Sequence, residues 1–449
     1  MQKVLPPVYV CCASRFMEIN LEPLLALYPD IRTVVVVRGV HSPVSEADER
    51  ETLRPSLSAR ELLKQQGIDV EELDVSPDDV TAVRDLLKHH LRSGWQDRDV
   101  LVNVTGGTKA MALGSLTGAL DAAPGRTRAF LYFSDPWPRV KVFVGGDAET
   151  PLPRPALSLD QMLALRGYRI LNGEASRAAE ERALVRRRLT EWLYQIATTA
   201  EGAADTACSV LNNLAKAAGS LDRNRAFPRE IPREKVDETV DGTDPNSLIA
   251  DNRWKFWSRL VTAPDLATVL DLSSDDAAVV ATEDALRYLG GGWLEEAVWL
   301  IARKALSEQQ GAEVRLGPHL GLISRQTGRR SDDVRDCDVL VVAAGRLHVL
   351  ECKTAVYGAE DRNSPNGGIG QKEINTLADI RLSLTGPYGT VAILNPRLPR
   401  RWNDHAATVM QHAREKGIQT WLGRDMDGQL RTALKAALQP AHSGSGLAR

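Results

Sequence analysis

Apolar runs alternate with amphipathic helical patterns along the first 146 residues of the chain. Three of the apolar runs are continuous and bounded by polar or turn residues, which is typical of strands buried on both faces. These runs cover residues 8–12, 33–37 and 100–104. Helical patterns cover residues 59–66, 78–91 and 109–120, and residues 129–133 and 140–144 predict a hairpin. The alternation predicts an α/β, Rossmann-like domain with a mostly parallel sheet.

Proline and charge patterns divide the rest of the chain. Residues 147–158 hold three prolines and predict a linker, and a helical pattern rich in Ala, Arg and Glu runs from 174 to about 221. Residues 223–246 are charged and contain prolines, which predicts an exposed loop. A second α/β pattern then runs helix, strand, strand pair, helix and strand. Its segments are 294–306, 313–316, 339–342, 347–353, 371–384 and 391–394.

Four regions follow from these patterns. We expect an N-terminal domain over residues 1–146 and a linker with a mainly helical connecting region over 147–284. A C-terminal α/β domain is expected over 285–436. The Gly- and Ser-rich tail over 437–449 is expected to be disordered.

Composition narrows the class of protein. The chain is 43% hydrophobic and 26% charged, which is ordinary for a globular protein. A formal net charge of −3 provides no global basic surface, so a nucleic-acid partner would need a local basic groove. Five cysteines without a CxxC spacing argue against both a disulfide framework and a structural zinc site. We expect a cytoplasmic protein with no signal peptide and no membrane span.

Three ionisable side chains meet at one end of the predicted strand pair. Side chains alternate between the faces of a strand, so Glu351 and Lys353 share one face while Leu350 and Cys352 share the other. Asp338 stands at the start of the partner strand, close to where the returning strand ends. The pattern therefore predicts a charged cluster at the edge of an otherwise apolar hairpin.

Such a cluster suits phosphodiester hydrolysis. The reaction needs a cation that neutralises the phosphate and lowers the pKa of the attacking water. Two carboxylates can hold Mg²⁺ or Mn²⁺, and the backbone carbonyl of Cys352 would be a further oxygen ligand. Lys353 could orient the water or stabilise charge on the phosphate. A third acid is expected from the helix that follows three consecutive glycines, with Glu295 preferred and Glu296 as the alternative.

The non-catalytic alternative is a surface hairpin with a salt bridge between Glu351 and Lys353. The surrounding order of helix, strand, hairpin, helix and strand instead resembles that of the PD-(D/E)XK nuclease core. That order favours the catalytic interpretation.

A second candidate site joins the third buried strand of the N-terminal domain to a helix. Paired glycines let the backbone approach a ligand closely, and free N–H groups at a helix start suit an anion. The sequence fits neither a Walker A loop nor GxGxxG, and a plain tight turn is the alternative. The end of the first strand should lie at the same carboxyl edge of the sheet. The candidate ligand-binding residues are Ser14, Arg15, Thr105, Gly106, Gly107, Thr108 and Lys109.

Residues 103–112, with a strand before and a helix after, resemble the signature of CARF domains, the CRISPR-associated Rossmann-like sensors. The Gly-Gly-Trp-Leu-Glu-Glu and Leu-Glu-Cys-Lys-Thr runs resemble those of CARF-linked PD-(D/E)XK effectors, the CRISPR ancillary nucleases. The resemblance covers about residues 1–146 and 285–395. The helical segment from about 174 to 250 matches no part of the family pattern.

The resemblance implies a cytoplasmic homodimer of type III CRISPR defence. Such proteins bind cyclic oligoadenylate, commonly cyclic tetra-adenylate, across the two CARF domains, and then cleave DNA, RNA or both with Mn²⁺ or Mg²⁺. On this sequence Ser14 and residues 105–109 would contact the ring. Glu295, Asp338, Glu351 and Lys353 would form the catalytic site.

Two other functions stay open at the level of sequence. A metal-independent HEPN ribonuclease needs an R-x4-6-H motif, and Arg400 with His405 has that spacing, as does Arg84 with His89 or His90. The third hypothesis is a CARF-linked regulator without nuclease activity.

Overall fold

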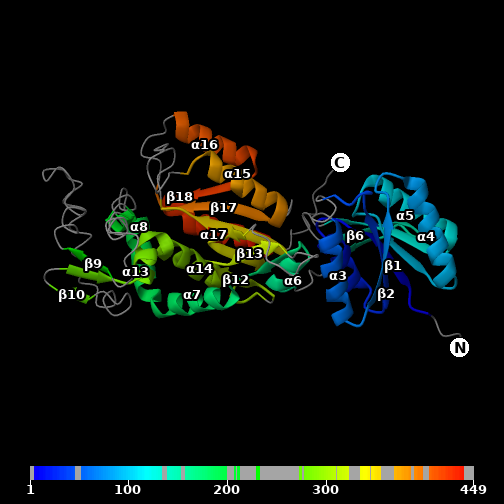
Figure 1. Cartoon of the computed structure of the whole chain (residues 1–449), viewed down its shortest axis with the longest axis horizontal. Helices are drawn as coiled ribbons and strands as arrows, with labels where there is room; N and C mark the ends of the chain where they lie inside the picture. Colours follow the sequence, from blue (N-terminus) through cyan, green and yellow to red (C-terminus); the bar gives the residue numbers. More distant parts are fainter. Residues whose placement is uncertain are drawn as a thin grey trace, which may run out of the picture.

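A computed structural model provides the structure of the chain. It describes residues 5–45, 52–133, 139–152, 157–199, 207–208, 210–212, 229–232, 273–275, 278–309, 311–322, 334–343, 345–354, 369–385, 389–397 and 404–438. Figure 1 shows an elongated molecule in which the N-terminal α/β domain lies at one end and the C-terminal α/β domain occupies the middle.

The N-terminal domain is built on one seven-stranded sheet with the order β3-β2-β1-β4-β5-β6-β7. The first five strands of this order pair in parallel, and β6 and β7 are antiparallel. Their bounds are β1 Val8–Cys12, β2 Thr33–Gly39, β3 Asp69–Val75, β4 Val100–Asn103, β5 Thr127–Phe133, β6 Arg139–Val144 and β7 Glu149–Pro151. The predicted Rossmann-like sheet and its terminal hairpin are therefore confirmed.

Helices cover both faces of this sheet. Leu21 of α1 and Leu63 of α3 share a core with Tyr9, whereas Val83 of α4 packs with Val10 on the opposite face. The helices are α1 Glu18–Leu27, α3 Arg54–Gln65, α4 Val80–Gly94 and α5 Lys109–Ala122. Burial on both faces explains why β1 and β2 are continuous apolar runs.

The connecting region differs in part from the predicted one. Residues 149–151 form β7 and extend the first sheet, so the prediction of a plain linker is wrong there. A capping box between Ser158 and Gln161 begins α6 (Leu159–Ala164). The predicted helical pattern is confirmed over α7 (Gly173–Val185) and α8 (Arg187–Thr199).

Short strands complete the connecting region. Strand β8 (Tyr168–Ile170) pairs with β13 (His319–Leu322), which also pairs with β14 (Val334–Asp336). Strand β9 (Arg229–Pro232) lies within the predicted loop 223–246 and pairs with β11 (Ala278–Ala281), so a loop is wrong for those four residues. The rest of that predicted loop lies outside the described residues. Strand β10 (Ser273–Asp275) completes this small sheet.

The C-terminal domain has a five-stranded sheet with the order β12-β15-β16-β17-β18. Antiparallel pairing joins β12, β15 and β16, and parallel pairing joins β16, β17 and β18. The strands are β12 Glu313–Leu316, β15 Val339–Ala343, β16 Arg346–Cys352, β17 Thr390–Asn395 and β18 Gln419–Leu422. Each strand predicted for this domain is present.

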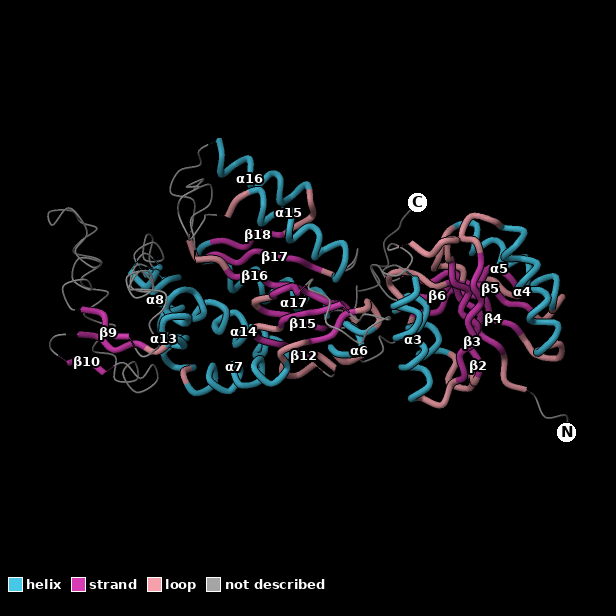
Figure 2. Tube along the Cα trace, viewed as in Figure 1, coloured by secondary structure: helices cyan, strands magenta, loops and turns pink. Residues whose placement is uncertain are grey.

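Helices sandwich this sheet as well (Figure 2). Trp299 of α14 and Leu430 of α17 share a core on one face, and Ile374 of α15 and Val409 of α16 belong to the core on the other. The helices are α13 Glu283–Arg287, α14 Trp293–Leu306, α15 Gln371–Ile380, α16 Asp404–Glu415 and α17 Met426–Leu438. A π-turn at residues 381–385 extends α15 as far as the predicted helix reaches.

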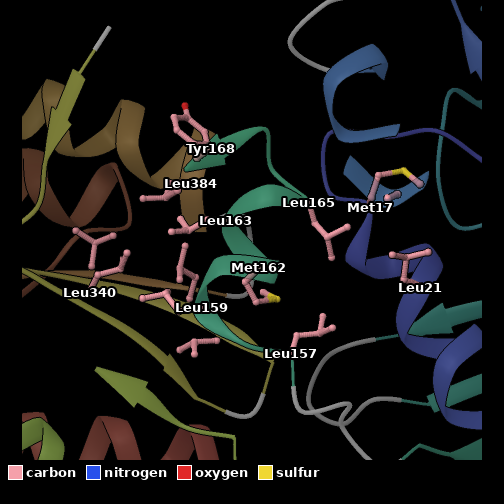
Figure 3. Close-up of a cluster of buried hydrophobic side chains, with 14 of the residues drawn as sticks. Met17, Leu21, Leu157, Leu159, Met162, Leu163, Leu165, Tyr168, Leu340 and Leu384 are labelled. Atoms are coloured by element: carbon pink, nitrogen blue, oxygen red, sulfur yellow. The ribbon is translucent and has the colours of Figure 1, made fainter. Parts of the chain in front are cut away.

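One hydrophobic core joins the two α/β domains through α6. Figure 3 shows Leu165 of α6's C-terminal end beside Met17 and Leu21, while Leu159 and Leu163 point toward the C-terminal domain. The connecting region is thus a packed part of the fold, not a loose tether. Within the described residues, no helix is long and apolar enough to cross a membrane.

Candidate functional site

The predicted charged cluster lies at one end of the β15–β16 hairpin. Val339 pairs with Leu350, which places Asp338 beside Glu351 just beyond the ladder. Asp338 Oδ2 accepts a hydrogen bond of 2.7 Å from the backbone N–H of Cys352. This bond fixes the Asp338 carboxylate across the strand pair.

Glu351 and Lys353 lie on the same face of β16 and form an ion pair. Lys353 Nζ donates to Glu351 Oε1 at 2.5 Å, and both side chains are largely shielded from solvent. The backbone N–H of Lys353 donates to Leu394 O of β17 at 2.9 Å. The end of β16 is therefore held between its two neighbouring strands, and three of the four predicted catalytic residues converge there.

Glu295 lies near this cluster, where a third acid is expected from the sequence. It lies in the first turn of α14, after a kink at Gly291, whose φ of 147° is a conformation that favours glycine. Glu295 lies near enough to Glu351 and Lys353 for their charges to shift its pKa. Glu296 points elsewhere, because its carboxylate is buried against Arg186 at 2.6 Å.

The cluster gathers three largely buried carboxylates around Lys353, with the charge of Arg287 also near Glu295. Burial raises the pKa of Asp338 well above its ordinary value, and the carboxylates of Glu351 and Glu295 raise it further. Burial also raises the pKa of Glu295. Although burial opposes it, the nearby carboxylates of Glu351 and Asp338 raise the pKa of Lys353. A bound cation would offset this surplus of carboxylates.

The donor set suits a hard divalent cation, since it consists of carboxylate oxygens. Within the described residues, no group of three or more His, Cys, Asp or Glu side chains is arranged so that it could hold a metal ion. The Glu351 carboxylate is instead engaged by Lys353. The residues thus provide the oxygen donors that a divalent cation prefers, and they are neighbours in the fold. Their carboxylates do not, however, form one coordination shell in this structure.

Several residues that support the cluster were not singled out from the sequence. Thr354 is buried after β16, and its hydroxyl lies 3.3 Å from Asn212 Nδ2, which donates to it. Arg397 Nη1 donates to Thr354 O at 3.1 Å. Both partners are remote in sequence, so no local pattern indicates them.

The second candidate site lies at the carboxyl edge of the N-terminal sheet, where β1 and β4 end side by side. Thr108 caps α5, since its hydroxyl accepts from Met111 N at 3.2 Å and donates to Pro77 O at 2.5 Å. Gly107, Thr108 and Lys109 are exposed at this edge. They present the start of α5 to solvent, which suits an anionic ligand.

Thr105 and Gly106 hold the same loop against the rest of the domain. Thr105 Oγ1 accepts from Tyr132 N at 2.7 Å. Gly106 is buried against Cys12 O, where an added Cβ would come within 2.7 Å. Ser14 and Arg15, at the end of β1, are half-buried, and Ser14 Oγ donates to Phe16 O at 3.1 Å.

Asn103 and Asn20 form a buried hub beneath this loop. Asn103 Nδ2 donates to Asn20 Oδ1 at 3.3 Å and to Tyr9 Oη at 3.1 Å. Asn20 Nδ2 donates to Cys12 O at 2.8 Å. Asn103 was noted only as part of the motif, and Asn20 was missed because its partners are distant in sequence.

The HEPN motif candidates do not form a site among the described residues. Arg84 pairs with its neighbour Asp85 at 2.8 Å, and His90 pairs with Glu71 at 2.7 Å. Arg400 lies outside the described residues, as does the side chain of His405.

Comparison with known proteins identifies the C-terminal domain. Residues 282–439 match the family described as Card1-like, endonuclease domain. The matched segment includes Glu295, Asp338, Glu351 and Lys353. No curated protein sequence is significantly similar to the chain.

Solved structures show the fold of the whole chain. Protein VC1899 from Vibrio cholerae aligns with a TM-score of 0.67 and 15% identity, over 97% of this chain and 99% of that one. Can2 from Sulfobacillus thermosulfidooxidans, in complex with cyclic tetra-adenylate, aligns with a TM-score of 0.57 and 16% identity, over 97% and 100%. A type III CRISPR defence DNA nuclease activated by cyclic oligoadenylate aligns with a TM-score of 0.41 and 18% identity, over 88% and 47%. Together with the family match over residues 282–439, the first two alignments confirm the predicted α/β architecture of a Rossmann-like domain followed by an endonuclease-like domain.

Proposed function

We propose that this chain, whose C-terminal segment matches the Card1-like endonuclease domain family, is a metal-dependent nuclease of type III CRISPR defence that a cyclic oligoadenylate activates. The observation that carries the proposal is the convergence of Glu295, Asp338, Glu351 and Lys353 at the end of the β15–β16 hairpin. Three acids and one ammonium group suit phosphodiester hydrolysis.

To hold Mn²⁺ or Mg²⁺, the neighbouring carboxylates of Glu295, Asp338 and Glu351 would have to draw together around the cation with the backbone carbonyl of Cys352, and Glu351 would have to turn from Lys353. When bound, the cation supplies charge neutralisation at the phosphate and a water of lowered pKa. Lys353 keeps its proton because the neighbouring carboxylates raise its pKa. It can therefore donate a hydrogen bond to the attacking water or to the phosphate as charge builds there.

The N-terminal edge is the proposed sensing site. Ser14, Arg15 and residues 105–109 would contact the ring, and the proposed ring is cyclic tetra-adenylate, the ligand in the Can2 complex. A homodimer would hold a two-fold ring across two copies of this edge, as symmetry favours. A DNA or RNA strand would be the substrate.

Helix α1 supports the proposal that ring binding controls cleavage. Asn20, near its start, contacts Cys12 O and the buried face of Gly106 in the ligand loop. Two residues later, the Glu22 carboxylate receives a hydrogen bond from Tyr132 Oη and lies beside Gly345 in the turn of the β15–β16 hairpin. The same hairpin carries Asp338 and Glu351 at its other end. A shift of α1 would thus act on both sites, as coupling through one packed element requires.

A ligand panel tests the proposal. Purified protein is incubated with cyclic tri-, tetra- or hexa-adenylate, with Mn²⁺ or Mg²⁺, and with plasmid, linear or single-stranded substrates. We expect cleavage only when a ring and a metal ion are both present, and none with the Glu351→Gln variant.

The other outcomes separate the alternatives. Cleavage without any ring would refute the sensing half of the proposal. Cleavage that persists in EDTA would favour the HEPN alternative. A cellular defence effect that survives Glu351→Gln would favour a regulator without nuclease activity.

A further inference from the structure

A buried ionic junction lies directly behind the proposed catalytic helix. Arg186, the single residue between α7 and α8, donates from Nε to Glu296 Oε1 at 2.8 Å and from Nη1 to Asp284 Oδ2 at 2.6 Å. Its guanidinium also stacks on the Tyr288 ring, 4.5 Å from the centroid. The side chains of Arg186 and Glu296 are only 6% and 5% exposed. One guanidinium thus holds residues from three successive pieces of chain: α13, the π-turn and α14.

A hydroxyl pair completes the junction. Thr190 Oγ1 donates to Glu296 Oε2 at 3.1 Å, and it lies 2.8 Å from Tyr288 Oη, with which it shares a hydrogen bond. Both oxygens of the Glu296 carboxylate are therefore engaged by groups from α7–α8. Burial raises the pKa of Glu296 while Arg186 opposes that shift, as expected for a carboxylate inside an ion pair.

The junction spans the kink that orients Glu295. Asp284 and Tyr288 lie before Gly291, where the backbone turns, and Glu296 lies after it. Glu295 is the residue next to Glu296, on the neighbouring face of the helix toward Asp338 and Glu351. Because Arg186 grips both sides of the kink, it fixes the rotation of the first turn of α14.

We propose that Arg186 is a positioning residue for the nuclease reaction: by clamping Asp284 and Glu296 across the Gly291 kink, it directs Glu295 into the carboxylate cluster. The inference rests on the proposed function and assigns a role to the connecting region. Arg186 lies outside the segment that matches the endonuclease family, which begins at residue 282. A residue of the α7–α8 segment, which precedes the matched domain in the sequence, therefore contributes to the geometry of the proposed catalytic site.

A purely structural role would be filled more simply by apolar residues. A buried ion pair is costly to desolvate, and well-packed hydrophobic residues often stabilise a fold equally well. What the charged junction adds is a fixed geometry with several directional hydrogen bonds. Residues that orient the groups of a metal site typically change metal affinity or activity about 10- to 100-fold when removed.

The test compares Arg186→Gln with Arg187→Gln. Arg187 is the next residue, and its ion pair with Glu191 at 2.7 Å is half exposed, which makes it a matched control. Full-length protein is assayed for the rate of ring-stimulated cleavage, for Mn²⁺ binding by calorimetry without substrate, and for hydrogen exchange of residues 288–296. For Arg186→Gln we expect a kcat about 10- to 100-fold lower with little change in KM. Weaker Mn²⁺ binding and faster exchange at the kink should accompany it, with Arg187→Gln close to wild type.

Two further variants keep the proposal falsifiable if Arg186→Gln does not fold. Arg186→Lys keeps the charge but cannot reach both carboxylates with a planar fork, and Thr190→Val removes one hydroxyl at nearly constant volume. Both should fold and lose activity by a smaller factor. Folded variants with wild-type kcat and Mn²⁺ binding would overturn the proposal. So would a loss of activity that only matches the loss of folded protein.

Wild type and Glu295→Gln in the same assay distinguish a failure of the proposed nuclease function from a failure of the proposed role of Arg186. If wild type does not cleave with ring and metal present, the proposed function fails. If wild type cleaves, Glu295→Gln does not, and Arg186→Gln equals wild type, only the positioning role of Arg186 fails.

Discussion

The carboxyl group of Asp338 meets two opposing demands. It must be negatively charged to hold a cation, yet burial and the neighbouring carboxylates of Glu351 and Glu295 raise its pKa. The hydrogen bond from Cys352 N to Asp338 Oδ2 favours the charged form only in part. Near neutral pH the metal-free protein therefore holds the Asp338 carboxyl group at a cost in stability, which is a common property of functional sites.

We expect Asp338→Asn to abolish cleavage and to stabilise the metal-free protein. Asparagine keeps an oxygen that can accept from Cys352 N but removes one of three clustered charges. The free energy of unfolding should rise by about 1–2 kcal/mol at neutral pH. Urea unfolding in the presence of a chelator measures the change.

The pH dependence has a definite sign. An acid whose pKa is raised by folding contributes stability below its unfolded pKa of about 3.9 and loses that contribution as the pH rises. The advantage of Asp338→Asn over wild type should thus be small near pH 4 and grow toward neutral pH. Asp336→Asn, which changes a side chain that is 74% exposed, is the control and should leave stability unchanged. An Asp338→Asn protein that is less stable than wild type at every pH would contradict this account.

At the level of elements, the buried strands were predictable and the charged or irregular elements were not. Continuous apolar runs locate β1, β2, β4 and β15 because each is buried on both faces. Strand β3 was missed because it carries four acids. Its Glu72 is neutralised by Arg38 at 3.1 Å and by Arg60 at 2.9 Å, partners that only the fold brings near.

Helix α1 was missed for a related reason. It contains Pro23 and has apolar residues distributed around most of its circumference, so no amphipathic stripe indicates it. The candidate cluster was predictable because Asp338, Glu351 and Lys353 lie on one hairpin, whose geometry follows from strand alternation. The choice between Glu295 and Glu296 needed the tertiary contact with Arg186, which is 110 residues away from Glu296 in sequence.

The glycine pair of the ligand loop leads to a prediction at the element scale. Gly107 has φ of +76°, and an added Cβ would lie 2.5 Å from Cys12 Cβ. We expect Gly107→Ala to distort the start of α5, to destabilise the protein by about 1–3 kcal/mol and to abolish ring binding. Thermal unfolding and isothermal titration with cyclic tetra-adenylate measure the two effects.

Gly125 is a close control for this substitution. It also has φ of +76°, but an added Cβ there would meet nothing within 4 Å. Gly125→Ala therefore carries the same backbone cost without the clash. Equal losses of ring binding in the two variants would contradict a specific role of the Gly107 turn.

At the scale of the whole molecule, packing and a buried ion pair connect the N-terminal domain to the α6 segment, which packs on the C-terminal domain. Arg166, just after α6, donates to Glu18 of α1 at 2.5 Å, with side chains only 4% and 8% exposed. The Arg166 guanidinium also lies over the Phe16 ring, 5.3 Å from its centroid. Phe16 follows Ser14 and Arg15 at the proposed ring site, so this contact links the sensing edge to the helix that packs on β15.

Uncoupling the two domains should therefore be possible without removing either site. A single substitution of Arg166 would leave Glu18 buried without its partner, which typically costs about 3–5 kcal/mol. The double variant Glu18→Met with Arg166→Met replaces both charges by apolar side chains of similar length and avoids that penalty. We expect it to fold and to bind the ring within a few-fold of wild type, because neither residue lies among those proposed to contact it. Ring-stimulated cleavage should fall about tenfold or more, since a coupling free energy of 1–3 kcal/mol corresponds to roughly 5- to 150-fold.

The matched control is the double variant Lys88→Met with Asp121→Met. These two residues form an exposed ion pair at 3.3 Å that lies wholly within the N-terminal domain, so this variant should keep wild-type stimulation. Titration calorimetry and cleavage rates with and without the ring separate binding from coupling. A double variant that binds the ring and is stimulated like wild type would show that the signal reaches the nuclease domain without the contact between Arg166 and α1.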